Sequence, residues 1–452
     1  MKLDVRFLVP GPGDRSILLD SDGGLPQQPL EGDEEVATVV PVDAFLRDIW
    51  SFAAAVLETH PKWKDVPEGE PIPTLVLTEP AAEDWTPPTG LAFGPIPADP
   101  GEIPSALRPR AEELLAELGG GAPPPPLRPR WARRGWRDRA SAWMRSAAAA
   151  AGAPLTGEPR PFFLRGISAL LRAPTSGPDL FLKAVFPPFH AEPVLTRMLA
   201  ERFPKAVPRV VAIEPDEGWL VVEDIGAAWI GDLPEADRPA GLRRGAETVV
   251  GIQRAFSTDG AAITSLLEAG APHRPLATLG ADVEAAIGPS GMAVEGGLEP
   301  DRAARVLGAV KESIAAVARI GLPDTVVHGD FHSGNAAIVG DGVVIIDWSD
   351  AAIGNPAVDF ITWIAWSEGR AAEIDAATEA WIGAWSTVVD GDALRAQIDD
   401  VLIVGAAYQL VSYDGIRRAL EPATQYTMIG GGSHFLKELE RILDERAAAA
   451  KR

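Results

Sequence analysis

The chain has 452 residues, of which 46% are hydrophobic and none is cysteine, and its formal net charge at pH 7 is −23. This length allows two or three domains, and the lack of cysteine excludes disulfides, thiolate zinc sites and a cysteine nucleophile, so any chemistry must use oxygen and nitrogen groups. The acidic balance argues against nucleic acid as a partner and mildly favours a cationic substrate, although solubility alone explains most of the charge.

No run of the sequence approaches the roughly 18 apolar residues that span a bilayer. The opening residues also lack a basic region followed by an apolar stretch. We therefore expect a cytoplasmic protein with no membrane partner.

Residues 1–118 alternate strand-like runs with proline and glycine. The runs Val5–Val9, Ser16–Leu19 and Thr74–Leu77 predict strands, and Val42–Leu57 predicts one helix. No acid cluster, glycine loop or metal-ligand spacing occurs here. We expect an accessory α+β module that is dispensable for the chemistry, so that a chain beginning near Arg130 should fold and act.

The segment 119–129 reads GGGAPPPPLRP and predicts a linker, because it joins a flexible glycine triplet to a stiff proline run. The following segment places Trp131, Trp136 and Trp143 among many arginines, before an alanine-rich helix. Such a pattern can bind single-stranded nucleic acid. A bridging helix that docks through its tryptophans fits the acidic chain better.

Short strand-like runs return between residues 152 and 226. Turn residues separate Phe162–Arg165, Ala169–Arg172 and Leu180–Val185, which predicts a small antiparallel sheet. A helix is predicted over His190–Arg202. A further strand pair is predicted at Arg209–Ile213 and Trp219–Glu223.

From residue 237 onward the composition and apolar spacing are mostly helical. Pro239 and Pro356 each stand at a predicted helix start, where a missing N–H costs nothing. The predicted helices are Ala240–Phe256, Arg302–Ile320, Ala357–Glu368, Ala371–Val388, Leu394–Leu420 and His434–Ala448.

The segment 326–360 places two acids and an amide, Asp330, Asp347 and Asn335, around a predicted hairpin. An apolar approach at Val326-Val327 leads to Asp330, a polar loop then reaches Asn335, and a predicted hairpin over 336–346 ends before Asp347. The two ends of a hairpin lie at one edge of a sheet, so we expect these oxygen groups to converge. Carboxylate and amide oxygens with room for water and phosphate suit Mg²⁺.

The pattern His-Gly-Asp-x-x-x-x-Asn followed by Ile-Asp-Trp resembles the aminoglycoside phosphotransferase and choline kinase family. The resemblance covers about residues 152–452 and implies a two-lobed, protein-kinase-like fold of class α+β. It also implies transfer of the γ-phosphate of ATP to a hydroxyl group. By this resemblance Asp330 is catalytic, while Asn335 and Asp347 bind Mg²⁺.

The resemblance extends to nucleotide-binding residues. Lys183 lies where the family places a strand lysine on the α and β phosphates, and Glu192 lies where it places the partner glutamate. The phosphate loop is expected near Gly166 and Ser168, with one glycine in place of the G-x-G-x-x-G of protein kinases. The hinge that binds adenine through backbone groups is expected at Val221, Val222 and Glu223.

Three further positions carry expectations with open alternatives. Asp359 either braces the catalytic loop, as in the family, or is a solvated acid in the first turn of a helix. His328 is expected to shape the loop backbone without acting as a base. His332 either touches substrate or phosphate or is incidental.

The acceptor is expected to be an amine-bearing or sugar-like molecule such as an aminoglycoside, sugar or amino alcohol. Asp350, Tyr408 and Tyr413 are predicted to hold it in an acidic, aromatic cleft. Trp363 and Trp366 are candidates for the same wall, but their helical spacing favours ordinary core.

The predicted organisation has four parts: an accessory module over 1–118, a linker and bridging helix over 119–151, an N-lobe over 152–226 and a helical C-lobe over 227–452. The alternative function is a nucleotide-binding pseudokinase or regulatory protein without turnover. A protein kinase is disfavoured, because Asp347 is followed by Trp348-Ser349-Asp350 and no Asp-Phe-Gly or Ala-Pro-Glu segment brackets an activation loop.

Overall fold

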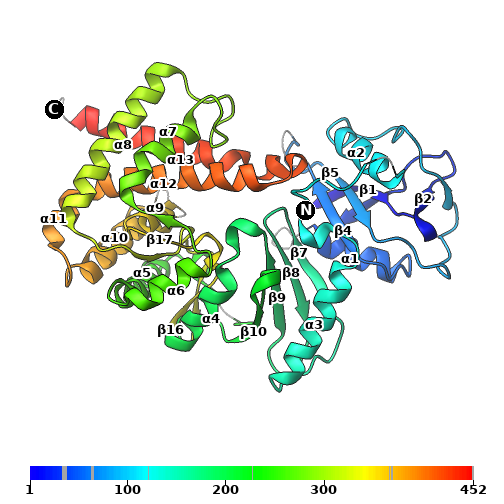
Figure 1. Ribbon diagram of the computed structural model, residues 1–452, viewed down its shortest axis with the longest axis horizontal. Coiled ribbons are helices and arrows are strands. Elements are labelled where there is room, and N and C mark those ends of the chain that lie inside the picture. The colour runs from blue at the N-terminus through cyan, green and yellow to red at the C-terminus, as the bar shows by residue number, and fades with distance from the viewer. Residues whose placement is uncertain are drawn as a thin grey trace. The chain divides into compact units, whose positions relative to one another are not determined.

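The computed structural model describes residues 1–32, 38–62, 66–120, 122–226, 228–365, 367 and 370–449. The chain forms two compact units (Figure 1). The first comprises residues 1–186 and 420–424, and the second comprises residues 187–419 and 425–452. Both contain helices and strands, so the chain is a mixed α+β protein.

The first unit opens with a four-stranded sheet in the order β3-β1-β5-β4. β1 pairs in parallel with β5, and the outer strands β3 and β4 pair antiparallel. β2 and β6 form a separate two-stranded ribbon. The strands are β1 (Lys2–Leu8), β2 (Ser16–Leu19), β3 (Gln27–Glu31), β4 (Val56–Pro61), β5 (Ile72–Thr78) and β6 (Ala92–Pro95), and the helices are α1 (Val39–Asp48) and α2 (Arg108–Leu118).

The helix predicted over Val42–Leu57 is wrong after residue 48. α1 ends at Asp48, and Ser51 then takes a positive φ of 50°, which a helix cannot contain. Residues from Val56 onward form β4, whose pairing with β5 overrides the helical propensity of the local alanines. α2 was not predicted.

A buried ionic network ties residue Glu421 into the first unit. Arg110 on α2 donates to Glu58 on β4 at 2.6 and 2.9 Å and to Glu421 Oε1 at 2.8 Å. Arg128 donates to Glu421 Oε2 at 2.9 Å and to Glu117 Oε1 at 2.7 Å. Glu421 is 1% exposed. Burial alone would raise the pKa of Glu58, but Arg110 outweighs it and holds that pKa below the usual value.

The rest of the first unit consists of the predicted alanine-rich helix α3 (Trp136–Ala150) and three antiparallel strands. These strands are β7 (Arg160–Leu164), β8 (Ser168–Ala173) and β9 (Leu180–Val185), with β8 in the middle. The small antiparallel sheet predicted from the sequence is confirmed. Trp136 is buried at the start of α3, as expected of a docking tryptophan.

The second unit begins with α4 (Glu192–Arg202) and the hairpin of β10 (Val210–Glu214) and β11 (Trp219–Glu223). Two small sheets follow, in the orders β12-β15-β16 and β13-β17-β14. Their strands are β12 (Ala228–Trp229), β13 (His273–Arg274), β14 (Thr325–Val327), β15 (Ala336–Val339), β16 (Gly342–Ile345) and β17 (Ala352–Gly354).

Helices make up most of the second unit, as predicted, and Figure 1 shows α12 running alongside α13. They are α5 (Arg238–Ser257), α6 (Gly260–Glu268), α7 (Leu276–Ile287), α8 (Pro300–Ile320), α9 (Val358–Ala365), α10 (Ala371–Trp385), α11 (Gly391–Ala396), α12 (Ile398–Ala419) and α13 (Ile429–Ala449).

Some helix predictions need correction. The predicted helix Leu394–Leu420 is two helices, because Gln397 leaves helical geometry with φ −109° and ψ 17°. The predicted helix Ala357–Glu368 is described only to residue 365, since Trp366 and Glu368 lie outside the described residues. α6 and α7 were not predicted. Within the described residues, no helix is both long enough and apolar enough to cross a membrane.

Candidate active site

The loop that follows β14 is held by Asp359 at the start of α9. Asp359 Oδ2 accepts hydrogen bonds from the backbone N–H of His328 and from Gln253 Nε2, both at 2.8 Å. Its Oδ1 accepts from the N–H of Gly329 at 2.7 Å. Asp359 is 1% exposed, so it is a buried brace of the loop and not a solvated acid.

His328 shapes the loop in the expected way. Its Nε2 lies 2.9 Å from the carbonyl of Ile346, and its Nδ1 accepts the N–H of Asp330 at 3.3 Å. These contacts fix a neutral ring with its proton on Nε2. The fully buried ring also packs 4.6 Å from that of Trp348. His328 therefore connects the start of the loop to the end of the hairpin and is committed to structure.

Gly329 has a φ of +82°, and a Cβ there would lie 2.2 Å from the carbonyl oxygen of Asp350. Only glycine permits both this conformation and this close approach. The Gly329 carbonyl in turn accepts from Gln409 Nε2 on α12 at 2.6 Å. Backbone contacts on both sides thus fix the residue that precedes Asp330.

Asp330 and Asn335 stand at the two ends of the polar loop. The Nδ2 of Asn335 donates to the backbone carbonyl of Asp330 at 3.1 Å, which fixes the distance between them. The side chain of Asp330 is 48% exposed, so its carboxylate can meet a ligand. His332 Nδ1 accepts the N–H of Gly334 at 3.0 Å, and burial lowers its pKa to about 4, against the opposing effect of Asp347. His332 is therefore neutral at pH 7 and helps to shape the loop.

Asp347 follows the hairpin with φ and ψ both at 61°. The left-handed region is strained for a residue with a side chain, although aspartate tolerates it better than most, and such strain gathers at functional sites. Ser349 Oγ lies 2.7 Å from Asp347 Oδ1 and 2.9 Å from Oε2 of the buried Glu192 on α4. The serine has one proton, so it can donate to one of these carboxylates at a time.

Asp350 adds a further carboxylate near those of Asp330 and Asp347. Burial raises its pKa, and the negative charges of Asp330 and Asp347 raise it more, against the opposing effect of Arg274. Ser412 Oγ on α12 donates to Asp350 Oδ1 at 3.2 Å. The negative charges of Asp330 and Asp347 thus act on Asp350, and a bound cation would offset this repulsion.

The residues predicted to hold the acceptor substrate differ in how deeply they are buried. Tyr408 is 1% exposed, and Arg274 lies 5.2 Å from its ring centroid. It is therefore part of the core. Tyr413 is half-buried, and burial together with the charges of Asp330 and Asp350 raises its pKa well above the usual range. Trp363 is buried and stacks on Phe331 at 4.0 Å, which makes it core as its spacing indicated.

The predicted nucleotide-binding residues lie on strands and turns. Lys183 is half-buried on β9. Gly166 lies in the tight turn between β7 and β8, where a Cβ would meet Leu420 at 2.8 Å, so packing alone accounts for the glycine. Ser168 is mostly buried at the start of β8.

The predicted hinge residues Val221, Val222 and Glu223 end β11. The N–H of Glu223 donates to the carbonyl of Arg209 at 3.1 Å within the hairpin, and its side chain forms an ion pair with Arg209. That amide already has a partner. A nucleotide base would therefore have to use other backbone groups of this segment.

Residues 175–396 match the family model described as the phosphotransferase enzyme family. This segment belongs to that family. The match contains the whole loop from Asp330 to Asp359, and the resemblance predicted from the sequence is confirmed. A search of curated protein sequences finds no significant match.

Several solved structures are similar to this chain at low identity. A choline/ethanolamine kinase family protein from Mesorhizobium loti is 19% identical, with 68% of this chain and 98% of the other covered and a TM-score of 0.46. A macrolide 2′-phosphotransferase from Brachybacterium faecium is 18% identical, with 64% and 97% covered and a TM-score of 0.42. The aminoglycoside phosphotransferase APH(4)-Ia, in complex with ADP and hygromycin B, is 13% identical, with 67% and 98% covered and a TM-score of 0.45.

The donor atoms of the loop fit a magnesium ion. Among the described residues no group of three His, Asp or Glu side chains is placed to hold a metal. Mg²⁺ needs fewer protein ligands than that, because it keeps waters and substrate phosphates. Asn335 directs its Nδ2 to a backbone carbonyl, which leaves Oδ1 as the atom that could bind a metal, and Asp347 could supply a carboxylate.

Sequence reasoning missed the residues that hold the loop 328–335 from outside it. Ser349 had a weak signal, since it stands two residues after Asp347. Gln253, Gln409, Ser412 and Arg274 had none, because each is an ordinary polar residue far from the motif in sequence.

We expect Asp359→Asn to destabilise the loop. An asparagine has one acceptor oxygen, so the backbone N–H of either His328 or Gly329 would face an NH2 group. A buried donor without a partner costs about 1–3 kcal/mol. Urea denaturation should therefore show reduced stability and turnover should fall, whereas Asp324→Asn, an exposed control in the preceding turn, should change neither.

This prediction has a pH signature. Burial raises the pKa of Asp359 from 3.8 to about 6, against the opposing effect of its hydrogen bonds. The folded state thus binds this proton more tightly than the unfolded state, so the contribution of Asp359 to stability falls as pH rises from about 4 to about 6. Asp359→Asn should lose that fall. An unchanged difference between pH 4 and pH 6 would contradict the assignment.

Proposed function

We propose that this chain transfers the γ-phosphate of ATP to a hydroxyl group of a small molecule in a Mg²⁺-dependent reaction. The observation that carries the proposal is the braced loop, in which contacts of His328, Asp359 and Asn335 fix the backbone at Asp330 while its carboxylate stays exposed. A loop with only a structural role would not need an exposed acid whose backbone is held by hydrogen bonds on both sides. The match to the phosphotransferase family supports the same reaction class.

In this proposal Asp330 orients the acceptor hydroxyl and accepts its proton late in the transfer. Asn335 Oδ1 and Asp347 hold the metal, and Ser349 keeps the Asp347 carboxylate in place. Mg²⁺, when bound, neutralises charge on the phosphates and aligns them. The roles of Lys183 and Glu192 in positioning phosphates rest on the family resemblance.

The division of the chain into lobes and an accessory module is also a proposal. We propose a two-lobed, kinase-like fold with an N-lobe over 152–226 and a helical C-lobe over 227–452. An accessory module over 1–118 and a linker with bridging helix over 119–151 precede it. Phosphate contacts at Gly166 and Ser168, adenine contacts at Val221 to Glu223 and a cytoplasmic location belong to the same proposal.

For the acceptor we propose an amine-bearing or sugar-like molecule held beside Asp350 and Tyr413. The charge of Asp330 raises the pKa of both side chains, which supports placing them on the same side of the loop as that carboxylate. A cationic amine would stabilise the ionised form of Asp350, whose charge is costly in this setting. Tyr408 is buried, so its proposed part is to support that pocket from the core.

The alternative is a nucleotide-binding pseudokinase or regulatory protein. Such proteins usually lose one of the groups needed for transfer, whereas Lys183, Glu192, Asp330, Asn335 and Asp347 are all present here. The choice between the two functions depends on turnover.

The test is ADP release by the purified full-length chain with Mg²⁺-ATP and a panel of aminoglycosides, sugars, amino alcohols and nucleoside-like antibiotics. We expect one class to raise ADP release above the rate without acceptor, with phosphate found on its hydroxyl. Asp350→Asn and Tyr413→Phe should raise KM for that acceptor. Binding of Mg²⁺-ATP without turnover on any acceptor would favour the pseudokinase alternative.

A further inference from the structure

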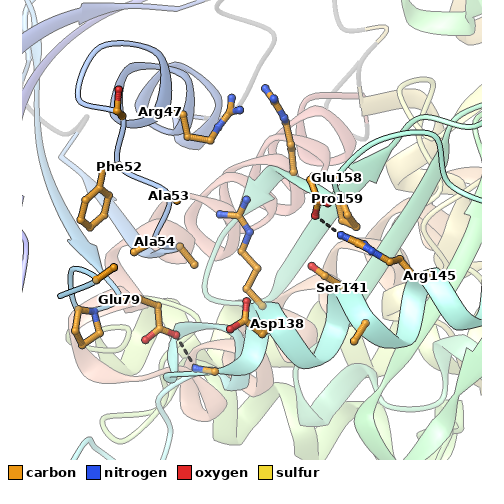
Figure 2. Close-up of a pocket in the computed structure, with 18 residues that line it drawn as sticks. Arg47, Phe52, Ala53, Ala54, Glu79, Asp138, Ser141, Arg145, Glu158 and Pro159 are labelled. Carbon is orange, nitrogen blue, oxygen red and sulfur yellow. Dashed lines mark hydrogen bonds and ion pairs between the residues drawn. The ribbon is translucent and has the colours of Figure 1, made fainter. Parts of the chain in front are cut away.

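A groove in the first unit lies outside everything described so far (Figure 2). Its walls come from the end of α1 and the turn 51–55 on one side, and from α3 and residues 158–160 on the other. Residues 79–82, after β5, close one end. Its volume is about 940 Å³, within the range of small-molecule sites.

Four arginines line this groove: Arg47, Arg137, Arg145 and Arg160. Arg47 and Arg137 share one buried carboxylate, that of Asp43, at 3.0 and 3.3 Å. One carboxylate cannot use the five N–H donors that each guanidinium carries. Both arginines therefore keep donors that a further anion could engage.

The other two arginines, Arg145 and Arg160, have fewer partners among the described residues. Arg145 pairs with Glu158, whose side chain is 76% exposed, and its Nη1 is buried with no hydrogen-bond partner in the described part of the chain. Arg160 is exposed at the start of β7 and forms no ion pair within the part of the chain that the structure describes. Figure 2 shows Arg47 on the α1 side and Arg145 on the α3 side.

Three acids line the groove beside the four arginines. Its acidic residues are Glu79, Asp138 and Glu158. Glu79 Oε1 accepts the N–H of Gly135 at 2.6 Å, and Glu158 is paired with Arg145. With the buried Asp43, four carboxylates stand beside the four guanidinium groups, so the groove is close to neutral in a chain of net charge −23, and it keeps N–H donors that its own acids do not use.

The rest of the lining is apolar or carries hydroxyl groups. Phe52, Ala53, Pro80 and Pro159 offer flat or small apolar surface, and Ser141 offers a hydroxyl. Guanidinium groups match phosphate oxygens two at a time, and the apolar surface suits an organic body. We propose that this groove binds a small organic phosphate of about nucleotide size, separately from the ATP of the proposed reaction.

The test is calorimetric titration of the full-length protein with AMP, ribose 5-phosphate and inorganic pyrophosphate, with ribose as the uncharged comparison. We expect one-to-one binding of at least one phosphate compound and none of ribose. The double variant Arg145→Gln/Arg160→Gln should weaken that binding by at least about tenfold, because it removes two charged donors. Neither arginine anchors the buried Asp43, so the fold should persist.

A matched control removes the same charge elsewhere. Arg139→Gln/Arg243→Gln changes two exposed arginines outside the groove, one of them on α3, and should bind within about twofold of the wild type. Asp347→Asn should also leave this binding unchanged, since it alters only the proposed metal site. The proposal is overturned if no phosphate compound binds, if the groove variant binds like the control, or if Asp347→Asn abolishes binding.

Discussion

Replacing Asp330 with asparagine should lower kcat by about 10²–10⁴-fold, the usual worth of general-base assistance. Asparagine keeps the size and one oxygen of the side chain but removes its charge and most of its basicity. The N–H of Asp330 would still donate to His328, and its carbonyl would still accept from Asn335, so the loop should keep its shape. Turnover with any accepted acceptor measures the effect.

Asp347→Asn is the matched comparison. It makes the same change in the aspartate that follows the hairpin, whereas Asp330 begins the loop that precedes the hairpin. A metal ligand that loses its charge should bind Mg²⁺-ATP more weakly, whereas Asp330→Asn should bind it almost as the wild type does. Calorimetric titration of Mg²⁺-ATP into both variants separates the two roles. Wild-type turnover by Asp330→Asn would refute the catalytic role of Asp330 and the proposed function with it.

Arg110→Leu should reduce the stability of the first unit by about 3–5 kcal/mol, the usual cost of breaking a buried ion pair from one side. Arg110 is the shared partner of Glu58 and Glu421, and all three side chains are almost fully buried. Leucine would leave Glu58 charged or force it to take up a proton. Urea denaturation followed by fluorescence measures the loss, because several tryptophans of this unit are buried.

Arg108→Leu is the control on the same helix. Arg108 pairs with Asp99 and Glu112, but its side chain is 38% exposed and that of Asp99 is 76% exposed. Exposed pairs contribute little to stability, so this variant should unfold close to the wild type. Equal unfolding midpoints for Arg110→Leu and Arg108→Leu would contradict the proposed importance of the buried network.

The same network changes the expectation for a chain that begins near Arg130. Such a chain lacks both Arg110 and Arg128, and Glu421 would lose the two cations that neutralise it. We therefore expect the shortened chain to be destabilised whatever the role of residues 1–118 in catalysis. Adding Glu421→Leu to the shortened chain should restore part of the stability.

The sequence by itself determined the site motif, because the motif is local. Turn glycines, a two-strand hairpin and fixed spacing place Asp330, Asn335 and Asp347 within one short segment, and strands β9 and β11 were predicted to the residue. The family resemblance followed from the residues of the same motif. Local spacing is readable because backbone geometry allows few arrangements over so short a distance.

Only the tertiary structure decided what surrounds the motif. The choice between a brace and a solvated acid at Asp359 depended on donors from Gln253 and the loop, and the contact of Ser349 with Glu192 joins residues 157 positions apart. The helix lost after Asp48 and the capture of Glu421 by Arg110 have the same origin. Strand pairing, burial and charge neutralisation between residues far apart in the sequence outweigh local propensity. The sequence of one segment does not show which distant residues it will contact.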